Sequence, residues 1–245
     1  MNTFLAEVRG TLAPNRADRF GPLPPLLIAM TLVTGLVDSF SYLLLGHVFV
    51  ANMTGNVVFL GFAVAGAQGF SIAASLVALV AFGIGSVFGG RIVARFGHHR
   101  GQHLAAATVA QALFLGISVI LAFAGSHPFG SAVRYSLIVA LSLAMGVQNS
   151  SARKLAVPDL TTTVLTLTVT GIGADSALGG GKGSKSGRRL LSVGAMFIGA
   201  LIGAALVLHV NVALPLTIAL AVVVVVAAVA YWSGRSNPAW TRVED

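Results

Sequence analysis

Six long stretches of the chain are apolar almost without interruption. Each is close to the roughly 20 residues that a helix needs to cross a hydrocarbon layer about 30 Å thick. The stretches are Pro24–Leu45, Ser71–Gly90, Leu104–Ala124, Ala132–Gly146, Leu190–His209 and Ala213–Trp232. This pattern predicts an all-α, polytopic membrane protein with six transmembrane helices.

Two further apolar segments are shorter and contain many polar residues. Phe49–Ala65 includes the run Asn52-Met53-Thr54-Gly55-Asn56. Val157–Ala174 includes Thr161-Thr162-Thr163, followed by Thr166, Thr168 and Thr170. Neither segment is long enough to span a bilayer comfortably, so each needs a separate explanation.

The basic residues indicate how the two short segments are used, because Lys and Arg collect on the cytoplasmic side of a membrane. With the N-terminal arm placed in the cytoplasm, three full crossings would put the next basic cluster, Arg91, Arg95 and Arg100, outside. If Phe49–Ala65 dips into the bilayer and returns, that cluster is cytoplasmic. Val157–Ala174 has basic flanks on both sides: Arg153 and Lys154, then Lys182, Lys185, Arg188 and Arg189.

We therefore favour six crossings plus two re-entrant or broken segments over eight full crossings. This topology leaves every Lys and Arg inside except Arg134. Unpaired backbone amides cost several kcal/mol in hydrocarbon, so re-entrant backbone has to be shielded by protein or line a wet cavity.

The two halves of the chain resemble each other at offsets that rise slowly along the sequence. In this topology each half has three crossings and one re-entrant segment, which makes the halves an inverted 3+3 repeat, an arrangement that recurs in transporters. The matching pieces are Gly35-Leu36-Val37-Asp38-Ser39 with Gly146-Val147-Gln148-Asn149-Ser150, then Thr54, Val57 and Gly61 with Thr166, Val169 and Gly173, and then Ile84, Gly85 and Gly89 with Ile198, Gly199 and Gly203.

Composition supports the membrane class and excludes several others. Of the 245 residues, 56% are hydrophobic and only 9% are charged, and the mean hydropathy is +0.90. The net charge of +8 comes from short basic clusters between apolar segments, so we expect a lipid bilayer as partner and no nucleic acid. The chain has no cysteine and therefore neither a disulfide nor a thiolate site.

Asp38 is the most informative candidate, since a carboxyl group inside a membrane helix is costly and is usually paired, hydrated or functional. It either binds a cation or proton or orients a polar solute, or it caps the broken segment through nearby amides. The side chains of the two short segments supply neutral hydrogen-bonding groups that suit a small polar or ionic solute, or that merely satisfy the local backbone. The predicted substrate-binding residues are Asp38, Asn52, Thr54, Asn56, Asn149, Thr161, Thr162 and Thr166.

Other features are interpreted structurally. Asp159 follows Pro158 and is expected to cap the start of a helix. The pairs Gly85/Gly89 and Gly199/Gly203 predict close helix packing, either within the chain or in a homo-oligomer. The histidines have no convincing catalytic or metal-binding partners, so we expect no enzyme, no metal and no cofactor.

The stretch Gly35-Leu36-Val37-Asp38-Ser39-Phe40-Ser41-Tyr42, followed by Val48 to Asn56, resembles the YoaK-like family of bacterial membrane proteins. Val157-Pro158-Asp159, Thr161-Thr162 and Thr166 are similar to the same family, and the resemblance extends roughly from Leu26 to Trp232. It implies an integral membrane protein of unknown function and supplies no substrate.

Together these observations predict residues 1–23 as a cytoplasmic arm, 24–234 as one transmembrane domain with repeat halves at about 24–125 and 132–234, and 235–245 as a cytoplasmic tail. The expected location is the bacterial inner membrane, with both termini in the cytoplasm. The predicted function is a transporter or channel for a small polar or ionic solute. The alternative is a scaffold or partner-binding subunit that transports nothing.

Overall fold

The computed structural model describes residues 2–14, 18–163, 165–176, 180–181 and 186–242, and these residues form helices joined by turns and loops, with no strand among them. Short helices occur at the N-terminus, after α2 and after α6, and a 3-10 turn, η2, closes the described chain. The elements are α1 (Asn2–Leu12), α2 (Leu23–Leu44), α3 (Met53–Val64), α4 (Ile72–Phe96), α5 (Arg100–Ala124), α6 (Ser131–Leu155), α7 (Leu165–Ala174), α8 (Ser186–His209), α9 (Leu214–Gly234) and η2 (Ala239–Thr241).

Six of these helices, α2, α4, α5, α6, α8 and α9, are long and apolar enough to cross a membrane. The prediction of an all-α protein with six spans is therefore confirmed. The main difference is in α6, which continues to Leu155, whereas the apolar stretch stops at Gly146. The helix ends where Ala156 takes a left-handed conformation, two residues before Pro158.

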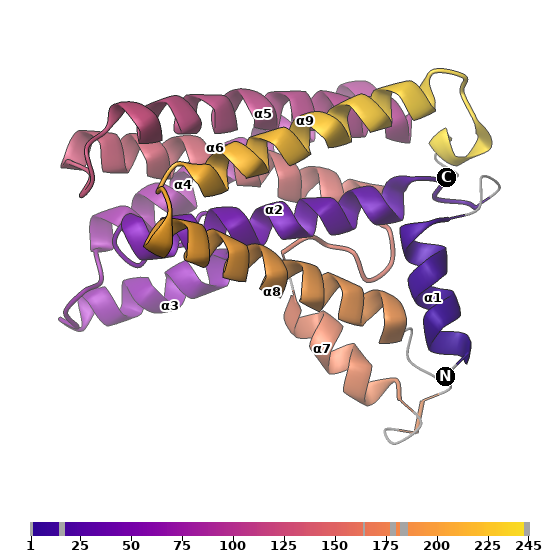
Figure 1. The fold of residues 1–245 in the computed structure, drawn as a ribbon, viewed down its shortest axis with the longest axis horizontal. Helices are drawn as coiled ribbons and strands as arrows, with labels where there is room; N and C mark the ends of the chain where they lie inside the picture. The colour runs from indigo at the N-terminus through magenta and orange to yellow at the C-terminus, as the bar shows by residue number, and fades with distance from the viewer. Residues whose placement is uncertain (1, 15–17, 164, 177–179, 182–185, 243–245) are drawn as a thin grey trace.

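The two short helices lie on the same side of the bundle and run toward opposite ends (Figure 1). After α2 the chain turns back toward the middle of the bundle, and α3 then returns to the end where α4 begins. After α6 the chain does the same from the other end, with α7 returning to the end where α8 begins. The position of a bilayer around this arrangement stays a prediction.

Glycines bring the long helices into close contact in two equivalent pairs. A Cβ at Gly199 of α8 would lie 2.2 Å from the carbonyl oxygen of Leu32 in α2. A Cβ at Gly85 of α4 would lie 2.3 Å from the carbonyl oxygen of Leu143 in α6. Since real Cβ atoms do not approach so closely, only glycine permits the backbones to pack this tightly.

The same equivalence holds one turn further along each pair. A Cβ at Gly203 would meet Ser39 and the carbonyl of Leu36, whereas one at Gly89 would meet Ser150 and the carbonyl of Val147. The glycines that the sequence pairs across the two halves thus make the same contacts in both helix pairs. They pack within the chain, so they carry no argument for a homo-oligomer.

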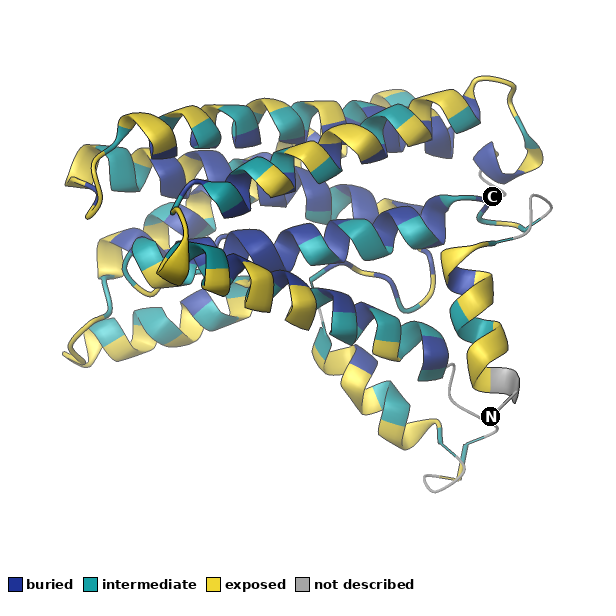
Figure 2. Ribbon diagram, viewed as in Figure 1, coloured by how far each residue is buried: buried dark blue, intermediate teal, exposed yellow. Residues whose placement is uncertain are grey.

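Burial is concentrated on α2 and on the inner face of α6, while the outer faces of the other long helices are exposed (Figure 2). Leu36, Phe40, Leu141 and Met145 have no exposed surface. Exposed large apolar side chains, such as Val80, Ile120 and Leu201, cover the outside. This distribution suits a bundle whose surroundings are as apolar as its core.

Both termini lie at the same end of the bundle (Figure 1). The N-terminal arm packs there as α1: the Glu7 carboxylate accepts a hydrogen bond from the backbone N–H of Gly187 at 2.9 Å. The C-terminal tail packs there as well, because Arg100 donates to the carbonyl of Trp240 at 3.3 Å. Lys182 and Lys185 lie outside the described residues.

Candidate functional site

An open cavity of about 1370 Å³ lies where the two short segments meet the long helices. It is bounded by the first turns of α3 and α7, by the loops that precede them, and by faces of α2, α4, α6 and α8. Apolar side chains and two glycines form slightly more than half of its lining, and polar side chains form the rest. The polar side chains that line it are Asp38, Ser39, Tyr42, Asn52, Thr54, Ser86, Asn149, Ser150, Arg153, Thr161, Thr163 and Thr166.

Asp38 joins α2 to the loop that leads into α3. Its Oδ1 atom accepts hydrogen bonds from the backbone N–H groups of Val50, at 3.2 Å, and Ala51, at 2.9 Å. These amides precede the helix and have no partner in a helical ladder, so the carboxyl group satisfies them. The other carboxyl oxygen makes no hydrogen bond with the described residues, and Asp38 is among the side chains that line the cavity.

The start of α3 is held by two asparagines with different roles. Asn52 is the N-cap and accepts from the backbone N–H of Gly55 at 3.3 Å. Asn56 is fully buried and binds both backbone groups of Phe49, accepting from its N–H at 2.9 Å and donating to its carbonyl at 2.6 Å. Asn56 therefore fixes the loop and does not line the cavity.

Stacked aromatic rings form one wall beside this loop. The ring centroid of Phe49 lies 5.0 Å from that of Tyr42 and 5.6 Å from that of Phe59. All three rings also border the cavity. The wall combines a large apolar surface with few rotatable bonds, so it keeps its shape at low entropic cost.

The second half builds its side of the cavity with Asn149, the position that matches Asp38. Its Oδ1 accepts a hydrogen bond from the hydroxyl of Thr163, and its Nδ2 donates to the carbonyl of Met145 at 2.9 Å. Thr161 and Thr166 are exposed at the cavity. A neutral amide in α6 thus takes the place that a carboxyl group has in α2.

Arg189, in the first turn of α8, binds three oxygen atoms of the second short segment and so holds that segment against α8. Its Nε donates to Asp159 at 2.9 Å, its Nη2 contacts Asp175 at 2.7 Å, and its Nη1 donates to the carbonyl of Gly171 in α7. The expectation that Asp159 caps a helix is wrong, because α7 begins only at Leu165 and Asp159 instead pairs with Arg189.

Replacing Arg189 with methionine is expected to loosen α7, since a planar guanidinium is needed to bind three oxygens from different parts of the segment. We expect a loss of about 1–3 kcal/mol in stability and faster amide hydrogen exchange throughout α7. The matched control is Arg188→Met, because Arg188 donates to Thr11 of α1 and forms no hydrogen bond or ion pair with the described residues of α7. Unchanged exchange in α7 of the Arg189 variant would contradict this role.

Six of the eight predicted site residues lie together around the cavity: Asp38, Asn52, Thr54, Asn149, Thr161 and Thr166. The other two do not. Asn56 is directed to the backbone of Phe49, and Thr162 faces a second, much smaller chamber. Arg153 and Thr163, which were not predicted, also line the cavity. Arg153 lies four residues after Asn149 and Thr163 directly follows Thr162, so closeness in the sequence to predicted site residues could have identified both.

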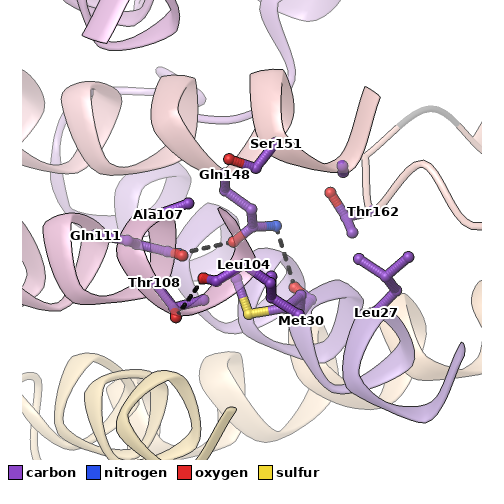
Figure 3. Close-up of a pocket in the computed structure, with 10 residues that line it drawn as sticks. Leu27, Met30, Leu104, Ala107, Thr108, Gln111, Gln148, Ser151 and Thr162 are labelled. Carbon is purple, nitrogen blue, oxygen red and sulfur yellow. Dashed lines mark hydrogen bonds between the residues drawn. The ribbon is translucent and has the colours of Figure 1, made fainter. Parts of the chain in front are cut away.

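A second polar cluster, missed at the sequence level, joins α2, α5 and α6 inside the bundle (Figure 3). Gln111 donates to Gln148 at 2.7 Å, and Gln148 in turn donates to Thr34 at 2.9 Å and to the carbonyl of Met30 at 3.3 Å. Gln111 lies within an apolar segment, where a glutamine is uncommon, and that was the available signal. Among the described residues no group of three His, Asp or Glu side chains could hold a metal ion.

Comparisons with known proteins agree with the membrane class. A family model described as "Protein of unknown function (DUF1275)" matches residues 26–230. The UPF0700 transmembrane protein YoaK of Bacillus subtilis (strain 168) is 36% identical over 145 residues. That alignment covers 59% of this chain and 63% of the relative, so the chain spans less than two thirds of the relative's length. No solved structure matches the chain.

Proposed function

This chain belongs to the family described as protein of unknown function DUF1275, and we propose that it moves a small polar or ionic solute across the bacterial inner membrane through the open cavity. The observation that carries the proposal is the cavity itself, which is bordered by the starts of two short helices and by a carboxyl group of a spanning helix. In known transporters, interrupted helices of inverted repeats meet in this way near the bilayer midplane.

The two short helices place partial positive charge at the cavity. Their N-termini carry the positive ends of helix dipoles, equivalent to about half a charge each. Asp38 brings a carboxyl group from α2 and Arg153 brings a guanidinium from α6. A polar or charged solute that leaves water can thus replace part of its hydration shell with fixed groups.

The proposed topology has two re-entrant segments, an inverted repeat and cytoplasmic termini. The equivalent glycine contacts of α2 with α8 and of α4 with α6 support the repeat. The basic residues support the orientation, because the described Lys and Arg side chains belong to helix ends or flanks on the side of the termini, with the exception of Arg134 at the start of α6.

A scaffold without transport is the second candidate, and one observation favours it. Among the described residues, the Asp38 carboxyl group accepts hydrogen bonds only from two backbone N–H groups, which is what a carboxyl group with a purely structural role would do. The two candidates differ in whether the cavity contains water, since a scaffold has no need for a hydrated path through the bilayer.

Single cysteines distinguish the candidates, because the chain has none of its own. We expect Thr54→Cys and Thr166→Cys to react with a small charged methanethiosulfonate reagent in membrane vesicles, since both side chains are exposed at the cavity. Val80→Cys, exposed on the outside of α4, and Ala78→Cys, fully buried, are the matched controls and should react at least about tenfold more slowly. If the two cavity cysteines react as slowly as Val80→Cys, the transport proposal fails.

A further inference from the structure

A chamber of about 10 Å³ lies between α2, α5, α6 and the loop of residues 156–163 (Figure 3). Its volume is about that of one water-sized probe, the minimum that a bound water needs. The wall is formed by Leu27, Met30, Leu104, Ala107, Thr108, Gln111, Gln148, Ser151, Ala152 and Thr162. The chamber is separate from the open cavity, since only Ala152 borders both.

Three oxygen atoms of the side chains in this wall are buried without a hydrogen-bond partner among the described residues. They are Oε1 of Gln111, Oγ of Ser151 and Oγ1 of Thr162. These residues are 0%, 2% and 1% exposed, so bulk water does not reach them. A buried polar atom without a partner costs about 1–3 kcal/mol. Three such atoms around one chamber indicate a shared ligand.

The chemistry of the wall selects water over an ion. No carboxyl group lines the chamber, and the remaining wall is largely apolar. A cation held only by neutral oxygens in such surroundings would lose far more hydration energy than three ligands return. Water suits hydroxyl and amide groups, because it can both accept and donate and usually makes two to four hydrogen bonds when buried.

We propose that the chamber binds an ordered water molecule that bridges the hydroxyl groups of Ser151 and Thr162 and donates to Oε1 of Gln111. The bridge connects the 156–163 loop to α6 and, through Gln111 of α5, to the polar cluster that includes Gln148 and Thr34. Thr162 has a φ of +64°, which turns its side chain into the chamber while its neighbour Thr161 lines the open cavity. The water thus holds in place the 156–163 loop, which forms one wall of the open cavity. The inference does not depend on transport.

The sign of a thermal shift tests the proposal. With water bound, Thr162→Val and Ser151→Ala should each lower the unfolding midpoint by about 2–4 °C, since each removes a hydrogen bond. The double variant should lose about as much as one single variant, because either change removes the same bridge. In a dry chamber both substitutions would instead remove an unsatisfied hydroxyl and raise the midpoint, and their effects would add.

Two comparisons complete the experiment. Thr170→Val makes the same substitution at an exposed threonine of α7 and should leave the midpoint within about 1 °C. Exchange of choline chloride for sodium chloride should also leave the wild-type midpoint unchanged. If sodium chloride raises the midpoint of the wild type but not that of the Ser151 and Thr162 variants, the chamber binds a cation. That result would overturn the water proposal. Rising or additive shifts in the variants would overturn it as well.

Discussion

Replacing Gly199 with alanine is expected to lower the unfolding midpoint of the purified protein by about 5–10 °C, the equivalent of ~2–3 kcal/mol. The new Cβ would lie 2.2 Å from the carbonyl oxygen of Leu32, and the backbones of α2 and α8 would have to separate to accommodate it. Intrinsic fluorescence of the two tryptophans provides the measurement.

The control lies in the same helix. A Cβ at Gly194 meets no atom within 4 Å, so Gly194→Ala should be neutral or gain up to about 1 kcal/mol from helix propensity. The other helix pair offers a second test, in which Gly85→Ala should resemble Gly199→Ala and Gly83→Ala should resemble Gly194→Ala. Equal behaviour of Gly199→Ala and Gly194→Ala would contradict the tight α2–α8 contact.

Replacing Asp38 with alanine should cost about 2–6 kcal/mol, because the N–H groups of Val50 and Ala51 would both lose their acceptor. Asp38→Asn keeps an oxygen in the same place and should cost about 1 kcal/mol or less. The second half of the chain has asparagine at the matching position, where the Oδ1 of Asn149 also accepts a hydrogen bond from the segment that precedes the short helix. Thermal unfolding of the two variants provides the comparison.

The isosteric variant also isolates the charge of Asp38. In the Thr54→Cys background, a carboxylate at the cavity should favour a cationic thiol reagent over an anionic one of the same size. Asp38→Asn should lower the ratio of their rates by about fivefold, the effect of one charge at close range in partly hydrated surroundings. An unchanged ratio would remove Asp38 from any role in handling charge and leave it a structural group.

The six spans could be predicted because the thickness of the hydrocarbon layer imposes a length on every apolar segment. The end of α6 could not be predicted in this way. Polar residues from Gln148 to Lys154 end the apolar stretch, yet they continue the helix, because hydrogen bonds within a helix do not depend on the polarity of its side chains. In this protein the apolar pattern marks where a helix is surrounded by apolar groups, and not where it stops.

Which polar residues of the short segments reach the cavity depends on backbone conformation that the pattern does not encode. Thr161 and Thr162 are identical neighbours, yet the positive φ of Thr162 directs them to different chambers. Asn52 caps the start of α3 and Asn56 lies in its first turn, yet the hydrogen bonds of Asn56 with Phe49 turn it away from the cavity. Single residues were therefore harder to assign than the segment that contains them.

Labelling of a cysteine placed at Ala65, just after α3, tests the central claim most directly. If the first short segment returns to its own side, Ala65→Cys in intact spheroplasts reacts with an impermeant maleimide, while Ala174→Cys, at the last residue of α7, reacts only after the membrane is opened. Eight full crossings would put both positions inside. Labelling of Ala65→Cys from the outside is the predicted result, and labelling that requires permeabilised cells would contradict the account.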